Sequence, residues 1–221
     1  MKNSTIRIKT IVEEISHKRI ADIGCDHGYT CIFACLYGKV NFAIASDIKS
    51  DPLEIAKKNI YNYNLQQKIN TRLGYGLHKI KPKEVDCLII TGVGGDTIIN
   101  ILKQGDEVIK HMSQLILSPQ SNVAKVRKFV HSLDFIILEE KFIKESDKYY
   151  NIINCQRGYE LPYSEKEYFL GKILIQKSDK LFLNYVSEKL QYLNAIKKKL
   201  SPQENSDINN KIEMYTLSLG E

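Results

Sequence analysis

The sequence predicts an α/β protein with a seven-stranded, mostly parallel sheet, followed by an antiparallel helical hairpin. Between residue 19 and about residue 158, short apolar runs alternate with longer helical patterns, which is typical of parallel strands joined by helices. The last two runs are separated only by Ser146-Asp147-Lys148, a joint short enough for an antiparallel hairpin. After Pro162 no strand pattern returns, and helical spacing of apolar residues takes over.

Seven runs rich in apolar and β-branched residues are the predicted strands. They span residues 19–24, 41–48, 69–74, 85–92, 114–119, 134–145 and 149–157. Before them, Ile8, Ile11, Val12 and Ile15 recur at helical spacing. This spacing predicts an amphipathic helix over residues 6–17 that covers the sheet edge.

Apolar spacing after Pro162 predicts one long helix over residues 164–200 and a shorter one over 205–219. Ser164 and Glu167 form a capping box at the start of the long helix, and Ser201-Pro202 ends it. We therefore expect a first domain over residues 1–160 and a helical hairpin over 161–221. The hairpin is either a passive lid or a surface that grips a partner.

The composition is that of an ordinary globular protein, with 43% apolar residues and a formal net charge of +6. This basic balance permits an anionic partner without requiring one. Charges are scattered through the N-terminal segment, so neither a signal peptide nor a membrane span is expected, and we interpret the protein as cytoplasmic. The five cysteines are expected to be reduced and buried. Cys31 and Cys35 share a helix face, but they lack a second ligand pair, and no metal site is predicted.

The loop after the first predicted strand, Asp22-Ile-Gly24-Cys25-Asp26-His27-Gly28, is the most informative segment. Glycine has no Cβ, so it lets the backbone approach a ligand closely. The loop lacks the spacing G-x-G-x-x-G of a dinucleotide-binding loop, and its carboxylates would repel a pyrophosphate. Carboxylates suit a ligand with ammonium, sulfonium and ribose hydroxyl groups. The loop therefore predicts S-adenosylmethionine as cofactor, and with it a methyltransferase.

Three further strand ends carry candidate site residues. Asp47 ends the second strand 23 residues after Gly24, where its carboxylate either accepts hydrogen bonds from both ribose hydroxyls or serves a turn. Gly74-Tyr75-Gly76 follows the third strand and would border the adenine. Gly92-Val93-Gly94-Gly95 ends the fourth strand. Its three glycines favour close approach of a ligand, since a tight turn needs only one of them.

Ser118-Pro119-Gln120 closes the fifth strand with groups that either recognise a base or cap the next helix. His27 fits packing against the cofactor better than a role as general base. The spacing shows no nucleophile–histidine–carboxylate arrangement and no paired catalytic carboxylates of the hydrolase type.

Together, the segments DIGCDHGY, DIKSDPLEIAKKN, RLGYGL, ITGVGGDTIINIL, LILSP and EEKFIKESDKYYNII resemble the TrmK family over essentially the whole chain. These are bacterial S-adenosylmethionine-dependent tRNA (adenine-N1)-methyltransferases that modify position 22. The resemblance implies a Rossmann-like class I methyltransferase fold, S-adenosylmethionine as cofactor and tRNA as partner. A monomer is expected, with a dimer as the alternative.

The resemblance and the loop pattern give two sets of site residues. The cofactor-binding candidates are Asp22, Gly24, Cys25, His27, Gly28, Tyr29, Asp47, Ile48, Gly74, Tyr75, Gly76, Gly92 and Gly94. The substrate-binding candidates are Gly95, Ser118, Pro119, Gln120, Lys125, Arg127, Lys128, Lys141 and Lys144, the basic ones as phosphate contacts. The family usually has an acidic residue at Tyr75, Met at Val93, Gly at Asp51 and Gln-Pro-Asn at Ser118-Pro119-Gln120.

Adenine N1 carries a lone pair, so methyl transfer needs alignment more than a strong base. The resemblance places Asp26 at the catalytic position, where a carboxylate can accept a hydrogen bond from the exocyclic amino group as positive charge develops. The N1 edge of a paired base must first be exposed or flipped. Two other functions stay open: a small-molecule methyltransferase and a non-catalytic RNA- or protein-binding module. Tyr75 favours the second of these.

Overall fold

The computed structural model describes residues 5–198 and 206–216. The chain divides into two compact units, Met1–Glu160 and Leu161–Glu221, and each is described by itself. Among the described residues, no helix has both the length and the apolar composition needed to cross a membrane. All five cysteines are free and buried.

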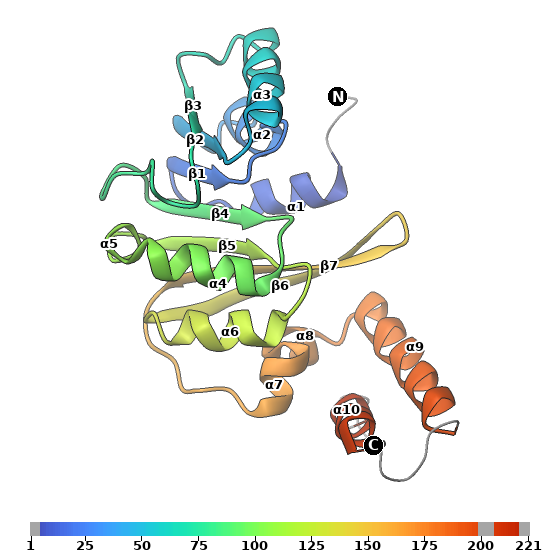
Figure 1. Ribbon diagram of the computed structural model, residues 1–221. Coiled ribbons are helices and arrows are strands. Elements are labelled where there is room, and N and C mark those ends of the chain that lie inside the picture. The colour runs from blue at the N-terminus through green and yellow to red at the C-terminus, as the bar shows by residue number, and fades with distance from the viewer. Residues whose placement is uncertain (1–4, 199–205, 217–221) are drawn as a thin grey trace. The chain divides into compact units, whose positions relative to one another are not determined.

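The first unit is built on a single sheet (Figure 1). Its strands are β1 (Arg19–Ile23), β2 (Phe42–Asp47), β3 (Ile69–Leu73), β4 (Cys87–Thr91), β5 (Gln114–Ser118), β6 (Phe135–Glu145) and β7 (Lys148–Arg157). They lie in the order β3-β2-β1-β4-β5-β7-β6, with β7 antiparallel to both β5 and β6 and the other pairs parallel. The predicted seven-stranded, mostly parallel sheet with a closing hairpin is confirmed.

The strand order places the topological switch next to β1. The chain runs from β1 to β2 on one side and reaches β4 on the other, so β1 pairs in parallel with both. In register, Asp22 is opposite Ala45 on β2 and Ile89 on β4. The loops that follow these three strands therefore leave the sheet at the same edge, where ligands bind in folds of this type.

Two groups of helices cover the sheet. The helices of the first unit are α1 (Ile6–Glu14), α2 (Tyr29–Leu36), α3 (Ser50–Asn62), α4 (Gly95–Gln104), α5 (Asp106–Ile109) and α6 (Val123–His131). Helices α1, α2 and α3 share one buried core with alternate strand residues, such as Ile20 on β1 and Ile89 on β4. Helices α4 and α6 pack on each other and lie in front of the sheet in Figure 1.

Helix α1 is shorter than the predicted span of 6–17. It begins at an N-cap, Thr5, whose side chain accepts a hydrogen bond from the Ile8 amide, and it ends at Glu14 because Ile15 is extended. The helix contacts α2 and β7 as well as the edge strand β6. Its apolar face packs into the core through Ile11 and Val12, so it does more than cover an edge.

The second unit contains α7 (Glu165–Leu170), α8 (Lys172–Lys177), α9 (Lys180–Lys197) and α10 (Ser206–Thr216). The prediction of one continuous helix from residue 164 is wrong. Gly171 has φ 99° and Ser178 has φ 47°, and each interrupts the helix, after which Asp179 caps α9. The capping box of Ser164 and Glu167 is confirmed.

Helices α9 and α10 contact each other, and the rings of Phe169 on α7 and Tyr215 on α10 meet edge to face at 5.3 Å. The predicted helix end at Leu200, its stop at Ser201-Pro202, and the predicted end of the last helix at Leu219 lie outside the described residues.

Candidate active site

A pocket of about 460 Å³ opens at the carboxyl ends of β1, β2 and β4. It is lined by Arg7, Ile8, Ile11, Asp22, Gly24, Cys25, Asp26, His27, Tyr29, Thr30, Asp47, Ile48, Lys49, Pro52, Thr91, Gly92, Val93 and Gln120. Its position at the switch next to β1 is where a doubly wound sheet binds its ligand. Its lining is rich in carboxylates.

The loop after β1 is shaped by two glycines with different roles. Gly24 has φ 76°, and a Cβ there would meet no atom within 4 Å, so this glycine leaves room in the pocket. Its amide donates to the carbonyl of Ser46 at 2.8 Å, which fixes the loop against β2. Gly28 has φ 74° and is the N-cap of α2, but a Cβ there would meet the Cβ of Ala56 at 3.1 Å. Gly28 therefore serves the packing of α2 on α3 and does not line the pocket.

Asp22 lies at the bottom of the pocket and is almost fully buried. Burial raises the pKa of Asp22 to about 7, because its charged form loses solvation there. A hydrogen bond from Thr30 lowers this pKa, the charge of Asp47 raises it, and the charge of Arg7 lowers it. A carboxylate in this state gains free energy from any cation that binds beside it.

Asp47 is also buried, at the end of β2, but its carboxylate is well supported. One oxygen accepts the amide of Asp26 at 3.1 Å and the other accepts the amide of Lys49 at 2.9 Å. Asp47 lines the pocket together with Ile48 and Lys49, and each of its carboxylate oxygens can accept a further hydrogen bond. The bond from the Lys49 amide is the predicted turn, and hydrogen bonds from a ribose diol stay a prediction for Asp47.

The three glycines after β4 do not all allow close approach of a ligand, contrary to the expectation from the sequence. Gly92 has φ 80° with no atom within 4 Å of its Cβ position, so it opens toward the pocket. Gly94 is the N-cap of α4, and a Cβ on it would meet the Ser121 hydroxyl at 3.0 Å, while a Cβ on Gly95 would meet the Ser121 carbonyl oxygen at 2.5 Å. Only one of the three glycines therefore faces the ligand space. The other two let α4 approach the loop before α6.

The segment Gly74-Tyr75-Gly76 does not line the pocket. A Cβ on Gly74 would clash with the side chain of Lys79, and one on Gly76 would contact Ile101, so both glycines serve local packing. The Tyr75 ring lies edge-on to His78 at 5.7 Å. The backbone of Gly74 still reaches the pocket wall, since its amide donates to the Asp47 carbonyl at 2.9 Å.

Asp26 and His27 form the outer rim. Asp26 has φ 50°, a left-handed conformation, and its side chain is 69% exposed. His27 places Nε2 3.6 Å from the Asp26 carboxylate, while the His27 carbonyl accepts a hydrogen bond from Asn59. The exposed Asp26 carboxylate thus belongs to a different environment from the buried Asp22 and Asp47.

Gln120 is the substrate candidate that lines the pocket, and its backbone N–H donates to the Val93 carbonyl at 2.9 Å. Ser118 is buried, and neither it nor Pro119 nor Gly95 lines the pocket. Among the basic candidates, Lys125 is exposed and pairs with Asp96 at 3.3 Å, and Lys128 is exposed on the same helix, α6.

The prediction of Arg127 as a phosphate contact is wrong. Its side chain is 1% exposed, and its Nε donates to Glu140 at 2.8 Å inside the first unit. A buried, paired guanidinium cannot reach a phosphate. The periodicity of α6 places Arg127 next to Val126 and Val130 on the inner face, whereas Lys125 and Lys128 point outward.

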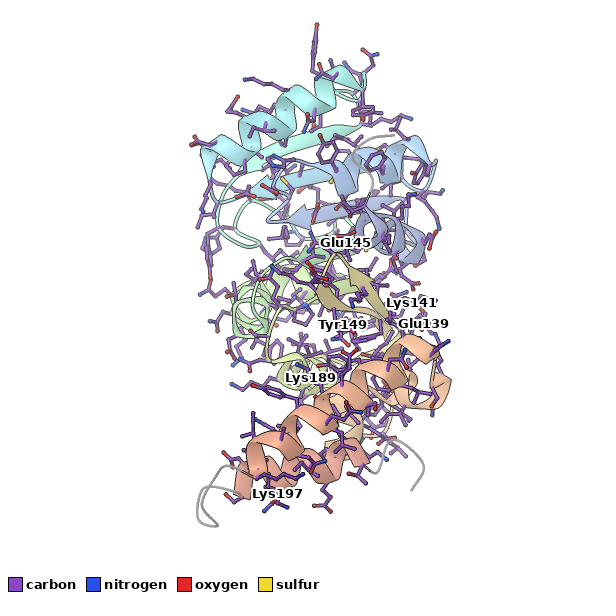
Figure 2. The ribbon with its side chains drawn as sticks, turned by 90° about the vertical axis from the view of Figure 1, so that its right-hand side faces the viewer. Glu139, Lys141, Glu145, Tyr149, Lys189 and Lys197 are labelled. Atoms are coloured by element: carbon purple, nitrogen blue, oxygen red, sulfur yellow. The ribbon has the colours of Figure 1, made fainter. Side chains whose placement is uncertain are left out.

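The β6–β7 hairpin carries the other two basic candidates, Lys141 and Lys144, of which Figure 2 labels Lys141. Lys141 lies 3.8 Å from Glu14 and 3.9 Å from Glu139, and its side chain is partly exposed. The Lys144 ammonium lies 5.2 Å from the centre of the Tyr149 ring. Both lysines remain candidate contacts of an anionic partner.

Sequence reasoning missed the wall that α1 contributes. Arg7, Ile8 and Ile11 line the pocket, although α1 precedes the whole sheet in the chain. No motif marks these residues. The helical spacing that predicts an apolar face at Ile8 and Ile11 was the available signal, but it does not reveal which part of the sheet that face covers. Thr30, Lys49, Pro52, Thr91 and Val93 were missed as well.

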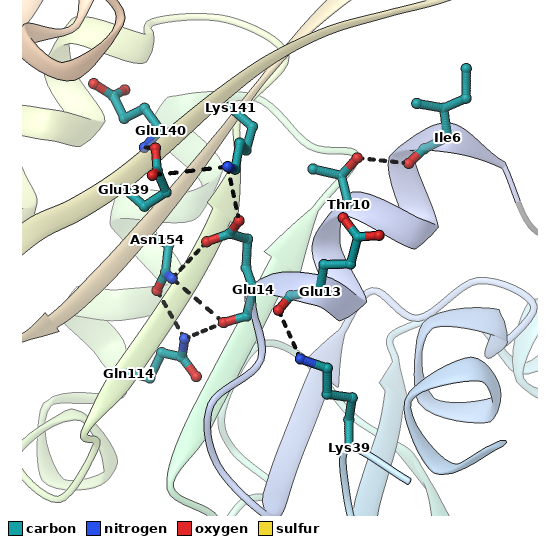
Figure 3. A network of polar contacts seen from close by, with 10 residues as sticks. All are labelled: Ile6, Thr10, Glu13, Glu14, Lys39, Gln114, Glu139, Glu140, Lys141 and Asn154. Atoms are coloured by element: carbon teal, nitrogen blue, oxygen red, sulfur yellow. Dashed lines mark hydrogen bonds and ion pairs between the residues drawn. The ribbon is translucent and has the colours of Figure 1, made fainter. Parts of the chain in front are cut away.

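A polar network holds the C-terminal end of α1 (Figure 3). The Gln114 amide donates to the Glu14 carbonyl at 2.7 Å and to the Asn154 side chain at 2.9 Å. The Asn154 amide donates to the Glu14 carboxylate at 2.9 Å, and Lys141 approaches the other oxygen of that carboxylate. Helix α1 is therefore bonded to β5, β6 and β7.

Comparison with known proteins identifies the family of the chain. Residues 20–217 match the family model of the TrmK proteins, described as tRNA (adenine(22)-N(1))-methyltransferase. The Bacillus subtilis tRNA (adenine(22)-N(1))-methyltransferase is 28% identical over 209 residues, covering 92% of this chain and 88% of the relative.

Two solved structures extend the comparison. The Mycoplasma capricolum TrmK, in complex with the cofactor product S-adenosyl-homocysteine, is 30% identical with a TM-score of 0.88, covering 98% of each chain. A Streptococcus pneumoniae protein in complex with S-adenosyl-L-methionine is 25% identical with a TM-score of 0.89, covering 96% of this chain and 98% of the other. The family match spans nearly the whole sequence, and the fold follows it over the same length. The chain belongs to the TrmK family of tRNA (adenine(22)-N(1))-methyltransferases.

Proposed function

We propose that this chain binds S-adenosyl-L-methionine in the pocket beside β1 and methylates N1 of adenine 22 in tRNA. The observation that carries the proposal is the pair of buried carboxylates, Asp22 and Asp47, at the ends of two adjacent parallel strands. The bound cofactor supplies an electrophilic methyl group on a sulfonium.

The residues present fit this cofactor. Asp22 offers a buried negative charge for the ammonium group, and Asp47 offers acceptor lone pairs for the ribose hydroxyls. Gly24 and Gly92 leave their Cβ positions empty on either side, so the backbone can approach the ligand. Ile48 and Val93 add apolar surface to the same pocket.

Asp26 is the proposed catalytic residue. Its carboxylate lies at the rim of the pocket and is largely exposed, so it can reach a base that enters from solvent. A hydrogen bond accepted from the exocyclic amino group would stabilise the positive charge that develops on the adenine during transfer. The nucleophile, N1, already has a lone pair, so no general base is required for the transfer itself.

Asp26→Asn tests this role. We expect methylation of tRNA transcripts to fall at least about tenfold because the amide carries no charge, while the affinity for S-adenosylmethionine, measured by calorimetry, changes little. Asp51→Asn is a matched control, since Asp51 is also exposed and lies in the first turn of α3 without lining the pocket. Full methylation by Asp26→Asn would show that the assignment is wrong. Methylation of small amines in place of tRNA would favour a small-molecule methyltransferase.

The proposed phosphate contacts are Lys125, Lys128, Lys141 and Lys144. If these lysines bind the phosphates, the affinity for tRNA should fall steeply as the salt concentration rises. We also propose that the unit Leu161–Glu221 is a separate helical domain, and that the protein acts as a monomer in the cytoplasm. The five free, buried thiols support a reducing compartment.

A further inference from the structure

The wall of the pocket contributed by α1 contains one charged side chain, Arg7. Its guanidinium carbon lies 4.9 Å from the centre of the Tyr150 ring, so the ring face supports one side of the group. Its Nε is buried and has no hydrogen-bond partner among the described residues. A buried donor without a partner is costly, and in a binding pocket it indicates a missing acceptor.

Two cationic side chains, Arg7 and Lys49, line the pocket at different places. At the end of β2, Lys49 is exposed and donates its amide to Asp47. At the end of β1, the charge of Arg7 acts on the carboxylate of Asp22. A cation and an anion therefore lie close together at the β1 end, where one ligand can meet both.

We infer that Arg7 binds the carboxylate of the cofactor's methionine moiety while Asp22 binds its ammonium group. The inference rests on the proposed function and adds a specificity residue to it. An amino acid zwitterion needs one acceptor and one donor group side by side, and Asp22 and Arg7 provide them. The planar guanidinium can donate two parallel hydrogen bonds to a carboxylate, which an ammonium on a flexible stem cannot do.

Both ends of α1 are fixed, so Arg7 is held in place before the ligand arrives. The Arg7 amide donates to the Glu145 carboxylate of β6 at 3.1 Å, and Glu14 is bonded to Gln114 and Asn154 (Figure 3). Preorganisation of this kind lowers the entropic cost of binding. The β6–β7 hairpin thus contributes to the cofactor site by holding helix α1 in place.

A pair of ligands isolates the carboxylate. S-adenosylmethionine and decarboxylated S-adenosylmethionine share the ammonium, the sulfonium and the adenosine, and differ only in the carboxylate. For the unmodified full-length chain we expect calorimetry to show tighter binding of the carboxylated ligand. For Arg7→Gln we expect about 10- to 100-fold weaker binding of S-adenosylmethionine and little change for the decarboxylated ligand. Arg7→Lys should retain part of the preference, because it keeps the charge and loses the fork.

Lys49→Gln is the matched control, because it removes the other cation of the pocket and should affect both ligands alike. Thermal unfolding of each ligand-free variant shows whether it is folded. Equal weakening of both ligands by Arg7→Gln would overturn the inference and make Arg7 a support of α1. An unmodified chain that binds both ligands equally would also overturn it. An unmodified chain that binds neither ligand would instead contradict the proposed function.

Discussion

Asp22 and Asp47 are both aspartates at the ends of neighbouring strands, but their carboxylates have different surroundings. Two backbone amides donate to the carboxylate of Asp47, so its charge is stabilised whether or not a ligand is present. Asp22 has Thr30 and the charge of Arg7 in its favour, yet burial and the charge of Asp47 raise its pKa to about 7. The protein itself stabilises the charge of Asp47, whereas the charge of Asp22 is stabilised further when a cationic group binds beside it.

The difference shows which of the two carboxylates gains free energy when a ligand binds in the pocket. The ligand-free protein tolerates a costly charge at Asp22, and an ammonium group that binds there removes part of that cost. Asp47 gives shape and acceptor geometry at little cost to the fold. Substituting the two residues in the same way should therefore produce effects of opposite sign on the stability of the ligand-free protein.

The largest effect is expected from Asp22→Asn. Loss of the negative charge should weaken S-adenosylmethionine binding about 100-fold or more, because the ammonium is left without its partner. At pH 8 the same change should raise the free energy of unfolding of the ligand-free protein by about 1–3 kcal/mol, since a buried charge is removed. Calorimetry and denaturant unfolding measure the two quantities.

The sign of that stability effect can be checked by pH. Burial raises the folded-state pKa of Asp22 above its ordinary value of 3.8, so the folded protein binds this proton more tightly. The contribution of Asp22 to stability is therefore fully present below about pH 4 and is lost as the pH rises to about 7. The advantage of Asp22→Asn should shrink at pH 5. An equal advantage at both pH values would contradict the assignment.

A smaller effect is expected in the pH dependence of cofactor binding. Below about pH 7 Asp22 takes up a proton and must release it when an ammonium binds. The dissociation constant for S-adenosylmethionine should therefore rise up to about tenfold for each pH unit below this value. Asp22→Asn should show no such slope, whereas Asp47→Asn should keep it. A slope that persists in Asp22→Asn would assign it to another group.

The smallest effect is expected from Asp47→Asn. The amide nitrogen of asparagine would face one of the two backbone amides that now donate to Asp47, and two donors cannot pair. We expect the free energy of unfolding at pH 8 to fall by about 1–2 kcal/mol and cofactor affinity to fall about tenfold. A stability gain like that of Asp22→Asn would remove the contrast between the two carboxylates.

The sheet was predictable because its strands are short, apolar and punctuated by turn residues. All seven runs formed strands, and the two-residue turn at Ser146 and Asp147 made the last two antiparallel, since it leaves no length for a crossover. The helix predicted from residue 164 failed at Gly171 and again at Ser178, where the backbone has positive φ although the apolar spacing continues. The spacing of apolar residues does not show where the backbone leaves the helical conformation.

The site was predictable where it is local. Asp22 and Asp47 lie in the last residues of β1 and β2, Gly24 follows β1 directly, and strand ends at the switch point meet by topology. Arg7 was missed and Arg127 was misassigned because their surroundings come from distant chain segments. Helix α1 contacts α2, β6 and β7 and is hydrogen-bonded to β5, and Arg127 is buried in an ion pair with Glu140 of β6. The sequence shows where an arginine stands in the chain, but not whether its side chain is buried in the folded protein.

The anchoring of α1 has a consequence for synthesis of the chain. The bonds that fix the helix join Glu14 to Gln114 and Asn154, which lie 100 and 140 residues later. A ribosome has exposed the glycine loop and both pocket aspartates long before it exposes these partners. The bonds that fix this wall of the pocket therefore form only when the closing β6–β7 hairpin has been translated and added to the sheet. Cofactor capture by nascent chains of increasing length would record the moment at which the domain becomes complete.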